Sequence, residues 1–261
     1  MATSGYAELP GVDLWFTDTG GPGISIVLLH PASGNTEVWQ YNADAFAAAG
    51  YRAIAFDRRG WGRTRINEMS DPQPGTASGD LDALADYLGV DRFHLLGAAA
   101  GGSVAYDYAL WRPERLRSLI VVATGASGLG DPGIAATRAR VDLPDFRKWP
   151  ARYRELSQGY MARDPEGTAR WDEIHARARQ RGIPSQPLRA PLTLAALEAI
   201  AVPTLLLAGE ADLTQPPWVV RIQAEHIPGA ELRLISESGH AMNWEQPEVF
   251  NRTVLEFIGR H

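Results

Sequence analysis

Short apolar segments alternate with helical patterns through the first half of the chain, and this alternation limits the possible folds more than any other feature. Residues 24–30 (ISIVLLH) and 93–97 (FHLLG) are almost wholly apolar, as expected of strands covered on both faces. Between them, residues 40–50 and 78–89 carry apolar positions at helical spacing and end at glycine. This order is typical of a parallel sheet with crossover helices, so we predict an α/β protein.

Later segments complete the prediction of a mostly parallel, eight-stranded sheet flanked by helices. The predicted strands are residues 6–9, 12–18, 24–30, 52–57, 93–97, 116–124, 202–209 and 230–236. The first two form a hairpin around Pro10 and Gly11, and the chain closes with an amphipathic helix. Between residues 125 and 200 a charged, aromatic stretch of helical period replaces the strand pattern. We predict a core of residues 1–124 and 201–261, with residues 125–200 inserted as a helical cap.

Composition and charge exclude several classes of function. The chain has 261 residues, no cysteine and a formal net charge of −6. The absence of cysteine excludes disulfides and thiolate metal sites, and the acidic balance offers no basic surface for nucleic acid or membranes. The start of the chain lacks a charged segment followed by an apolar run, and no apolar segment is long enough to cross a bilayer. We therefore expect a cytoplasmic protein that binds a small molecule, with its oligomeric state left open.

Polar or turn residues follow several predicted strands at positions where they can meet. These residues are His30, Asp57, Ala99, Asp212 and His240. Because ligands of open parallel sheets bind beyond the carboxyl ends of the strands, we expect a site there. Gly97 and Gly101 flank Ala99 with the spacing of a G-x-S-x-G turn, which presents a catalytic serine between a strand and a helix. In this chain the central residue of that turn is alanine.

Five motifs occur in a recognisable order along the chain. They are LLHPASG (28–34), FDRRGWGRT (56–64), LLGAAAGG (95–102), LLAGEADLTQPP (206–217) and SGHAMNWEQPEVFNRTVLEFI (238–258). With these motifs the chain resembles the α/β-hydrolase superfamily, in the capped branch that includes esterases, lactonases, C–C-bond hydrolases, haloperoxidases and dehalogenases. The motifs cover nearly the whole chain except the predicted cap. The resemblance implies the fold of that superfamily and neither a metal nor an organic cofactor.

The resemblance also implies a catalytic centre whose residues follow the order nucleophile, acid, histidine. Asp212 would orient His240, which would act first as general base and then as general acid. Glu210 is the nearest substitute for Asp212. The backbone N–H groups of Ala32 and Ala100 would bind a developing oxyanion.

Side chains near these loops are the candidate substrate contacts. They are His30, Trp39, Trp149, Tyr160, Leu213 and Trp244. His30 is also expected to shape the oxyanion loop. Trp39 and Trp244 neighbour catalytic loops, whereas the aromatic residues of the cap fit helix packing first and pocket lining second. The residues expected to be structural are Asp57, Arg59 and Arg63 in the turn after the fourth strand, and Ser103 one helical turn beyond the elbow.

Because an alanine methyl cannot attack a carbonyl, Ala99 closes the covalent acyl-enzyme route. In one interpretation, a catalytic serine was replaced by an engineered alanine. In another, the alanine is natural, and His240 with Asp212 activates water or removes a substrate proton, as a lyase or cofactor-free oxygenase would. A third makes the chain a small-ligand binder, although a binder needs no such pair. We predict a hydrolase of a small, fairly apolar ester, lactone or C–C carbonyl compound, with the first two interpretations open.

Overall fold

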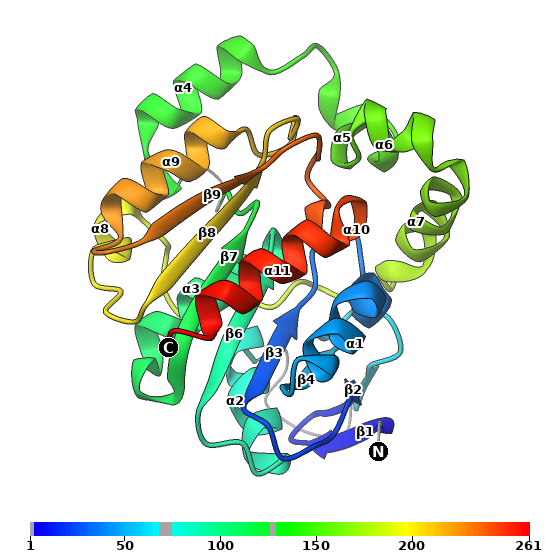
Figure 1. Ribbon diagram of the computed structural model, residues 1–261, viewed down its shortest axis with the longest axis vertical. Helices are drawn as coiled ribbons and strands as arrows, with labels where there is room; N and C mark the ends of the chain where they lie inside the picture. The colour runs from blue at the N-terminus through cyan, green and yellow to red at the C-terminus, as the bar shows by residue number, and fades with distance from the viewer. Residues whose placement is uncertain (1–2, 68–74, 126–128) are drawn as a thin grey trace.

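The computed structural model describes residues 3–67, 75–125 and 129–261, and within them one nine-stranded sheet forms the centre of the molecule (Figure 1). Its order is β1-β2-β4-β3-β6-β7-β8-β9, with β5 paired to β2. The strands are β1 (Thr3–Leu9), β2 (Val12–Asp18), β3 (Ser25–Leu29), β4 (Arg52–Phe56), β5 (Arg65–Ile66), β6 (Phe93–Ala98), β7 (Leu116–Val122), β8 (Thr204–Gly209) and β9 (Glu231–Ile235). Each of the eight predicted strands is present, and the sequence prediction missed only the two-residue β5.

The sheet is antiparallel at one end and parallel through the rest. β1 and β2 form the predicted hairpin, and Gly11 takes the positive φ of 77° that its turn requires. β2 pairs antiparallel with β4, and every pairing from β4 through β3 to β9 is parallel. The carboxyl ends of the parallel strands therefore share one edge, where the predicted site residues lie.

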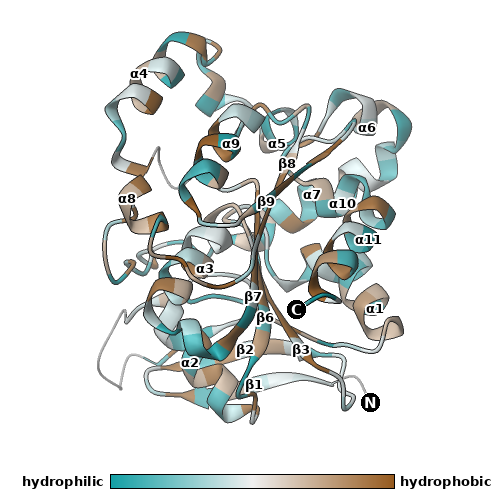
Figure 2. Cartoon of the chain, turned by 60° about the vertical axis from the view of Figure 1, so that its left-hand side comes forward, coloured by the Kyte–Doolittle hydropathy of each residue, from teal (hydrophilic) through white to brown (hydrophobic). Residues whose placement is uncertain are grey.

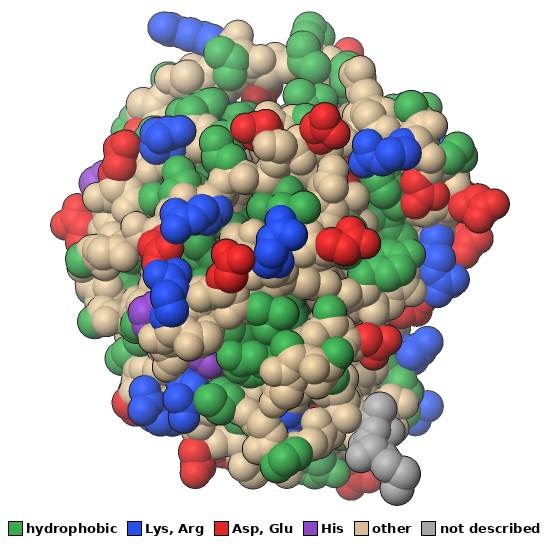
Figure 3. All heavy atoms as spheres, viewed as in Figure 1, with side chains coloured by type: hydrophobic (Ala, Val, Ile, Leu, Met, Phe, Trp, Pro, Cys, Tyr) green, Lys and Arg blue, Asp and Glu red, His purple; other side chains and the backbone are tan. Residues whose placement is uncertain are grey.

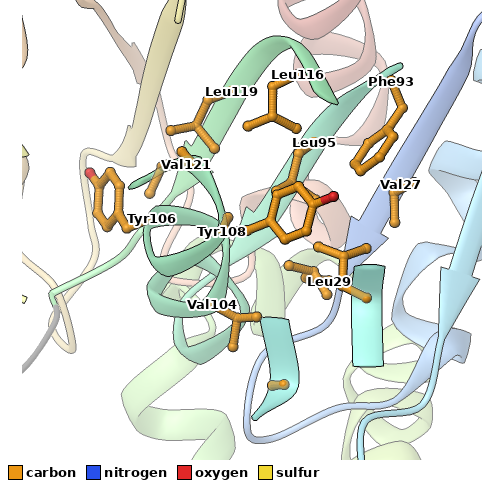
Figure 4. Packing of buried hydrophobic residues seen from close by; sticks show 14 of the residues in the cluster. Val27, Leu29, Phe93, Leu95, Val104, Tyr106, Tyr108, Leu116, Leu119 and Val121 are labelled. Atoms are coloured by element: carbon orange, nitrogen blue, oxygen red, sulfur yellow. The ribbon is translucent and has the colours of Figure 1, made fainter. Parts of the chain in front are cut away.

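Helices cover both faces of the sheet. They are α1 (Gln40–Ala48), α2 (Ala77–Tyr87), α3 (Ala100–Trp111), α9 (Pro217–His226), α10 (Met242–Glu245) and α11 (Pro247–Ile258). Alternate residues of a strand pack on opposite sides: Val27 and Leu29 of β3 join the cluster that contains α2 and α3 side chains, and Ile26 and Leu28 join the cluster with α1 and α11 (Figures 1 and 4). Each fully buried Leu or Ile stabilises the fold by roughly 1.5–3 kcal/mol.

The segment between β7 and β8 is helical, and most of it lies along the edge of the sheet where the parallel strands end (Figures 1 and 2). Its helices are α4 (Pro132–Val141), α5 (Ala151–Glu155), α6 (Gln158–Arg163), α7 (Pro165–Ala178) and α8 (Leu194–Leu197). Residues 126–128, at the start of the predicted cap, lie outside the described residues. Leu197 of α8 belongs to the cluster on the α2 and α3 side, so the last helix packs on the core. The division into core and cap stays a prediction.

Two groups of backbone hydrogen bonds tie these helices to the loops below. The Gly62 N–H donates to the Ala178 carbonyl at the end of α7 (2.8 Å), and the Gln180 N–H donates to the Gly60 carbonyl (2.8 Å). The His240 N–H donates to the Glu155 carbonyl at the end of α5 (2.8 Å). The helical segment thus holds the predicted histidine loop directly. In the described ranges, no helix has the length and apolar character needed to cross a membrane.

Candidate active site

The turn between β6 and α3 has the backbone of a nucleophile elbow, and its glycines explain why. An added Cβ at Gly101 would overlap the Leu29 carbonyl, and one at Gly102 would overlap the Thr124 hydroxyl. Close approach of the chain on both sides forces a sharp reversal at Ala99, which takes φ 49° and ψ −112°. This conformation is unfavourable for a residue with a Cβ and costs about 1–3 kcal/mol.

Hydrogen bonds fix the elbow in this strained form. The Ala99 N–H donates to the Val122 carbonyl (2.8 Å), and the Thr124 hydroxyl donates to the Ala99 carbonyl (3.1 Å). The assignment of Ala99 to the nucleophile position stays a prediction. Ser103 lies inside α3, where its N–H donates to the Ala99 carbonyl (3.2 Å), in agreement with the structural role expected for it.

The acid and histidine loops bring Asp212 and His240 together. Asp212 follows β8 and His240 follows β9, and these strands are parallel neighbours, so their ends meet. His240 Nδ1 lies 2.8 Å from Asp212 Oδ2, and Asp212 Oδ1 accepts the Gln215 N–H (2.7 Å). The Asp212 side chain is fully buried, whereas Glu210 is exposed. The geometry therefore pairs the histidine with Asp212, and the catalytic roles of both residues stay predictions.

Two further carboxylates lie around the histidine, and the sequence prediction did not include either of them. The Glu155 carbonyl accepts the N–H groups of both His240 (2.8 Å) and Ala241 (3.1 Å), while its buried Oε2 has no hydrogen-bond partner in the described part of the chain. Glu245 accepts the N–H groups of Ser157 (2.9 Å) and Gly239 (3.0 Å). Burial raises the pKa of Glu245.

Together with Asp212, these carboxylates raise the pKa of His240. Burial lowers the pKa of the imidazole, but the charge and hydrogen bond of Asp212, with the charges of Glu155 and Glu245, outweigh it. The net pKa of His240 therefore lies above the ordinary value of 6.5. An imidazole with a raised pKa is a stronger base once it has lost its proton.

His30 is a structural residue of the loop after β3. Its Nε2 accepts the Arg58 N–H (3.1 Å) and its Nδ1 lies 2.7 Å from the Pro31 carbonyl, so the ring carries its proton on Nδ1. Burial, aided by the positive charge of Arg58, holds the pKa of His30 well below its usual range. Because the side chain is completely buried, His30 shapes the loop as expected, but the prediction that it contacts substrate is wrong for this conformation.

The two predicted oxyanion donors have backbone N–H groups free to bind a ligand. Ala32 accepts a hydrogen bond from Trp61 Nε1 through its carbonyl (2.8 Å), which fixes the loop without using the amide. Ala100 is the first residue of α3, so its N–H is one of the N-terminal donors that have no acceptor within the helix. Across residues 3–67, 75–125 and 129–261, neither N–H donates to a protein acceptor. The role of these two amides as oxyanion donors stays a prediction.

The other predicted substrate contacts are mostly core or surface residues. Trp39 and Trp244 are each 1% exposed and belong to the cluster beneath α1 and α11, so their prediction as pocket residues is corrected. Tyr160 is also buried, and its hydroxyl donates to the Asp164 carboxylate (3.1 Å). Trp149 and Leu213 are exposed. Proximity in sequence to a catalytic loop did not place these side chains in a pocket.

The turn after β4 is held by the residues predicted to be structural. The buried Asp57 carboxylate accepts the N–H groups of Thr36 (2.7 Å) and Arg63 (2.8 Å). Arg59 forms a buried ion pair with Asp80 (2.7 Å). Among the described residues, no three His, Asp or Glu side chains are grouped closely enough to hold a metal ion.

Comparison with known proteins identifies the family. Residues 26–253 match the model of the alpha/beta hydrolase family. The chain is 29% identical over 280 residues to a 2-hydroxy-6-oxononadienedioate/2-hydroxy-6-oxononatrienedioate hydrolase of Burkholderia vietnamiensis, covering 99% of this chain and 96% of that protein. It is 29% identical over 265 residues to a putative carbamate hydrolase, RutD, of a Caulobacter species, covering 92% and 93% of the two chains.

A solved enzyme structure has a similar fold. The N-acyl homoserine lactone degrading enzyme Est816 superimposes with a TM-score of 0.76 at 28% identity, over 97% of this chain and 99% of that one. The chain belongs to the α/β-hydrolase family. The fold and the class of enzyme expected from the resemblance, a hydrolase, are confirmed.

Proposed function

We propose that this chain hydrolyses a small, fairly apolar ester, lactone or C–C carbonyl compound, with water rather than a side chain as the nucleophile. The observation that carries the proposal is the 2.8 Å contact of His240 with the buried Asp212 carboxylate, at the edge of the sheet where the Ala32 and Ala100 amides are unused. In this proposal His240 is the base, the two amides form the oxyanion site, and water takes the place of a nucleophilic side chain.

In the proposed hydrolysis a proton passes from water to His240 and then from His240 to the leaving group. Neutral His240 takes a proton from water through Nε2, and the water oxygen attacks the substrate carbonyl carbon. The negative charge that develops on the carbonyl oxygen is stabilised by the N–H groups of Ala32 and Ala100. The imidazolium, held by Asp212, then returns the proton to the departing alkoxide or carbanion, which restores the neutral histidine.

The relatives support a carbonyl substrate without identifying it. By their names, the three proteins compared above act on a 2-hydroxy-6-oxo diacid, a carbamate and an N-acyl homoserine lactone. In each case the reaction centre is a carbonyl group that water can attack. Ala99 adds one requirement. Because no covalent intermediate forms at this position, the water and the substrate must be held together in one complex.

Ala99 favours a second candidate function that uses the same residues. A lyase or cofactor-free oxygenase begins by removing a substrate proton, which requires the His240 base and an oxyanion site for the resulting enolate but no nucleophile. This candidate differs from hydrolysis in its product, because no water is added.

The test is turnover of a panel containing a p-nitrophenyl ester, an N-acyl homoserine lactone and a β-diketone, with products identified by mass spectrometry. We expect the chain to hydrolyse at least one of them and His240→Ala to lower kcat by about 10²–10⁴-fold, the usual contribution of a general base. His226→Ala, which changes a half-exposed histidine paired with Glu198, is the matched control and should keep full activity. Equal turnover by the chain and by His240→Ala would refute the proposal.

A further inference from the structure

A cleft of about 810 Å³ opens between α4, the 3₁₀ helix Phe146–Lys148, α5 and α9. It adjoins the acid loop, because its lining residue Gln215 donates its N–H to Asp212 Oδ1 (2.7 Å). Figure 1 shows α4 lying above α9, and Figure 2 shows the same pair after rotation. Ala135 and Ala139 of α4 give it exposed apolar surface, while the lining side chains of Ile134, Phe146 and Val219 are almost completely buried. A cleft of this size and lining suits a small organic ligand.

Three arginines also line the cleft, and two of them lack a counter-ion. Arg138 pairs with Asp142, the carboxylate that lines the cleft (3.0 Å). Within the described ranges, Arg147 and Arg154 form no ion pair, although Arg154 Nε donates to the Trp149 carbonyl (3.0 Å). The cleft therefore has an excess of positive charge in a protein whose net charge is −6. On the face shown in Figure 3, by contrast, acidic and basic side chains are interspersed.

Hydrogen bonds connect the wall of the cleft to both catalytic loops. Thr214, two residues after Asp212, donates from its hydroxyl to the Arg154 carbonyl (2.7 Å), and its own carbonyl accepts from Arg138 Nη1 (3.0 Å). Arg154 immediately precedes Glu155, whose carbonyl holds the histidine loop. None of the residues predicted to act in catalysis lines the cleft.

We propose that this cleft binds a small amphipathic carboxylate, with its apolar body against Ala135 and Ala139 and its carboxylate between the guanidinium groups of Arg147 and Arg154. Guanidinium groups form strong, charge-assisted hydrogen bonds with carboxylates, and two unpaired arginines provide them here. This site goes beyond the proposed hydrolysis, because its ligand contacts no reacting group. A bound ligand would brace Thr214 and α5, and through them the acid and histidine loops.

The experiment measures binding of 4-phenylbutyrate and of its neutral analogue 4-phenylbutanamide by isothermal titration calorimetry. We expect the carboxylate to bind at least about tenfold more tightly than the amide, because only the carboxylate meets the arginine charges. Arg147→Gln should remove that preference. Arg140→Gln, which neutralises an exposed arginine of α4 outside the cleft, should keep it.

A second pair of variants locates the ligand. Ala139→Glu places a negative charge in the cleft from an exposed position of α4 and should reduce carboxylate affinity at least about tenfold. Ala136→Glu adds the same charge to an exposed α4 position that does not line the cleft, and should bind as the unchanged chain does. Equal affinity for acid and amide, equal loss in both glutamate variants, or no binding by the unchanged chain would overturn the proposal. His240→Ala should bind 4-phenylbutyrate normally, so a failure of hydrolysis is distinguished from a failure of this site.

Discussion

The elbow between β6 and α3 and the two loops after β8 and β9 meet at the same edge of the sheet, but they are prepared for chemistry in different ways. The elbow keeps a strained backbone, with Ala99 at φ 49°, and has no reactive side chain. The loops keep a reactive pair, with His240 Nδ1 at 2.8 Å from Asp212 Oδ2 and two more carboxylates nearby. In the proposed function, one region would provide backbone donors and the other would transfer the proton.

The difference shows that the backbone of an elbow can be maintained without its serine. The conformation of Ala99 is imposed by Gly101 and Gly102, which allow the close approach of Leu29 and Thr124, so it does not depend on the side chain at position 99. The Ala100 amide keeps its place for the same reason. The proposed function relies on this amide to bind the oxyanion.

Placing a serine at position 99 should have the largest effect, because it gives the elbow the reactive side chain that it lacks. We expect Ala99→Ser to accelerate hydrolysis of a p-nitrophenyl ester by more than about a thousandfold, since loss of a triad serine typically costs more than that. Stopped-flow assays should show a burst of p-nitrophenol as the acyl-enzyme accumulates. Ala100→Ser, which adds a hydroxyl one residue away, is the matched control. An Ala99→Ser variant without a burst or a rate increase would show that His240 does not reach position 99.

Relieving the strain of the elbow should have a smaller effect, on stability. Glycine adopts the backbone angles of Ala99 without a Cβ penalty, so Ala99→Gly should raise the free energy of unfolding by up to about 1 kcal/mol, measured by chemical denaturation. Ala136→Gly, in the exposed part of α4, should instead lower it by about 1 kcal/mol, as glycine does within helices. If both substitutions destabilise the chain equally, the elbow is not strained.

The sheet could be predicted from the sequence, because the pattern of an apolar strand followed by a helix recurs along the chain. β3, β4 and β6 are buried and apolar on both faces, and the helices α1 and α2 between them end near Gly50 and Gly89, both with positive φ. β5 was missed because two residues carry no periodicity. The helices between β7 and β8 range from the four residues of α8 to the fourteen of α7, and Pro150 and Pro165 stand at the starts of α5 and α7, so their number could not be derived from helical spacing alone.

The candidate site was only partly predictable. Asp212 and His240 follow neighbouring strands, so their meeting could be expected. Glu155 lies in a charged, helical stretch whose carboxylates are usually solvated, and only the packing of α5 on the histidine loop buries it. Trp39 and Trp244 were placed by sequence neighbourhood, although large aromatic side chains more often fill a core, as they do here.

The pH dependence of kcat/KM for the unchanged chain tests the central claim most directly. If His240 acts as general base beside the carboxylates of Asp212, Glu155 and Glu245, it must be neutral to act, so activity rises with pH. We expect the rise to pass through a pKa above 6.5, the ordinary value for histidine, because these negative charges raise the pKa of the imidazole. A profile that is flat, or that rises through a pKa at or below 6.5, would contradict the assignment of this pair as the catalytic centre.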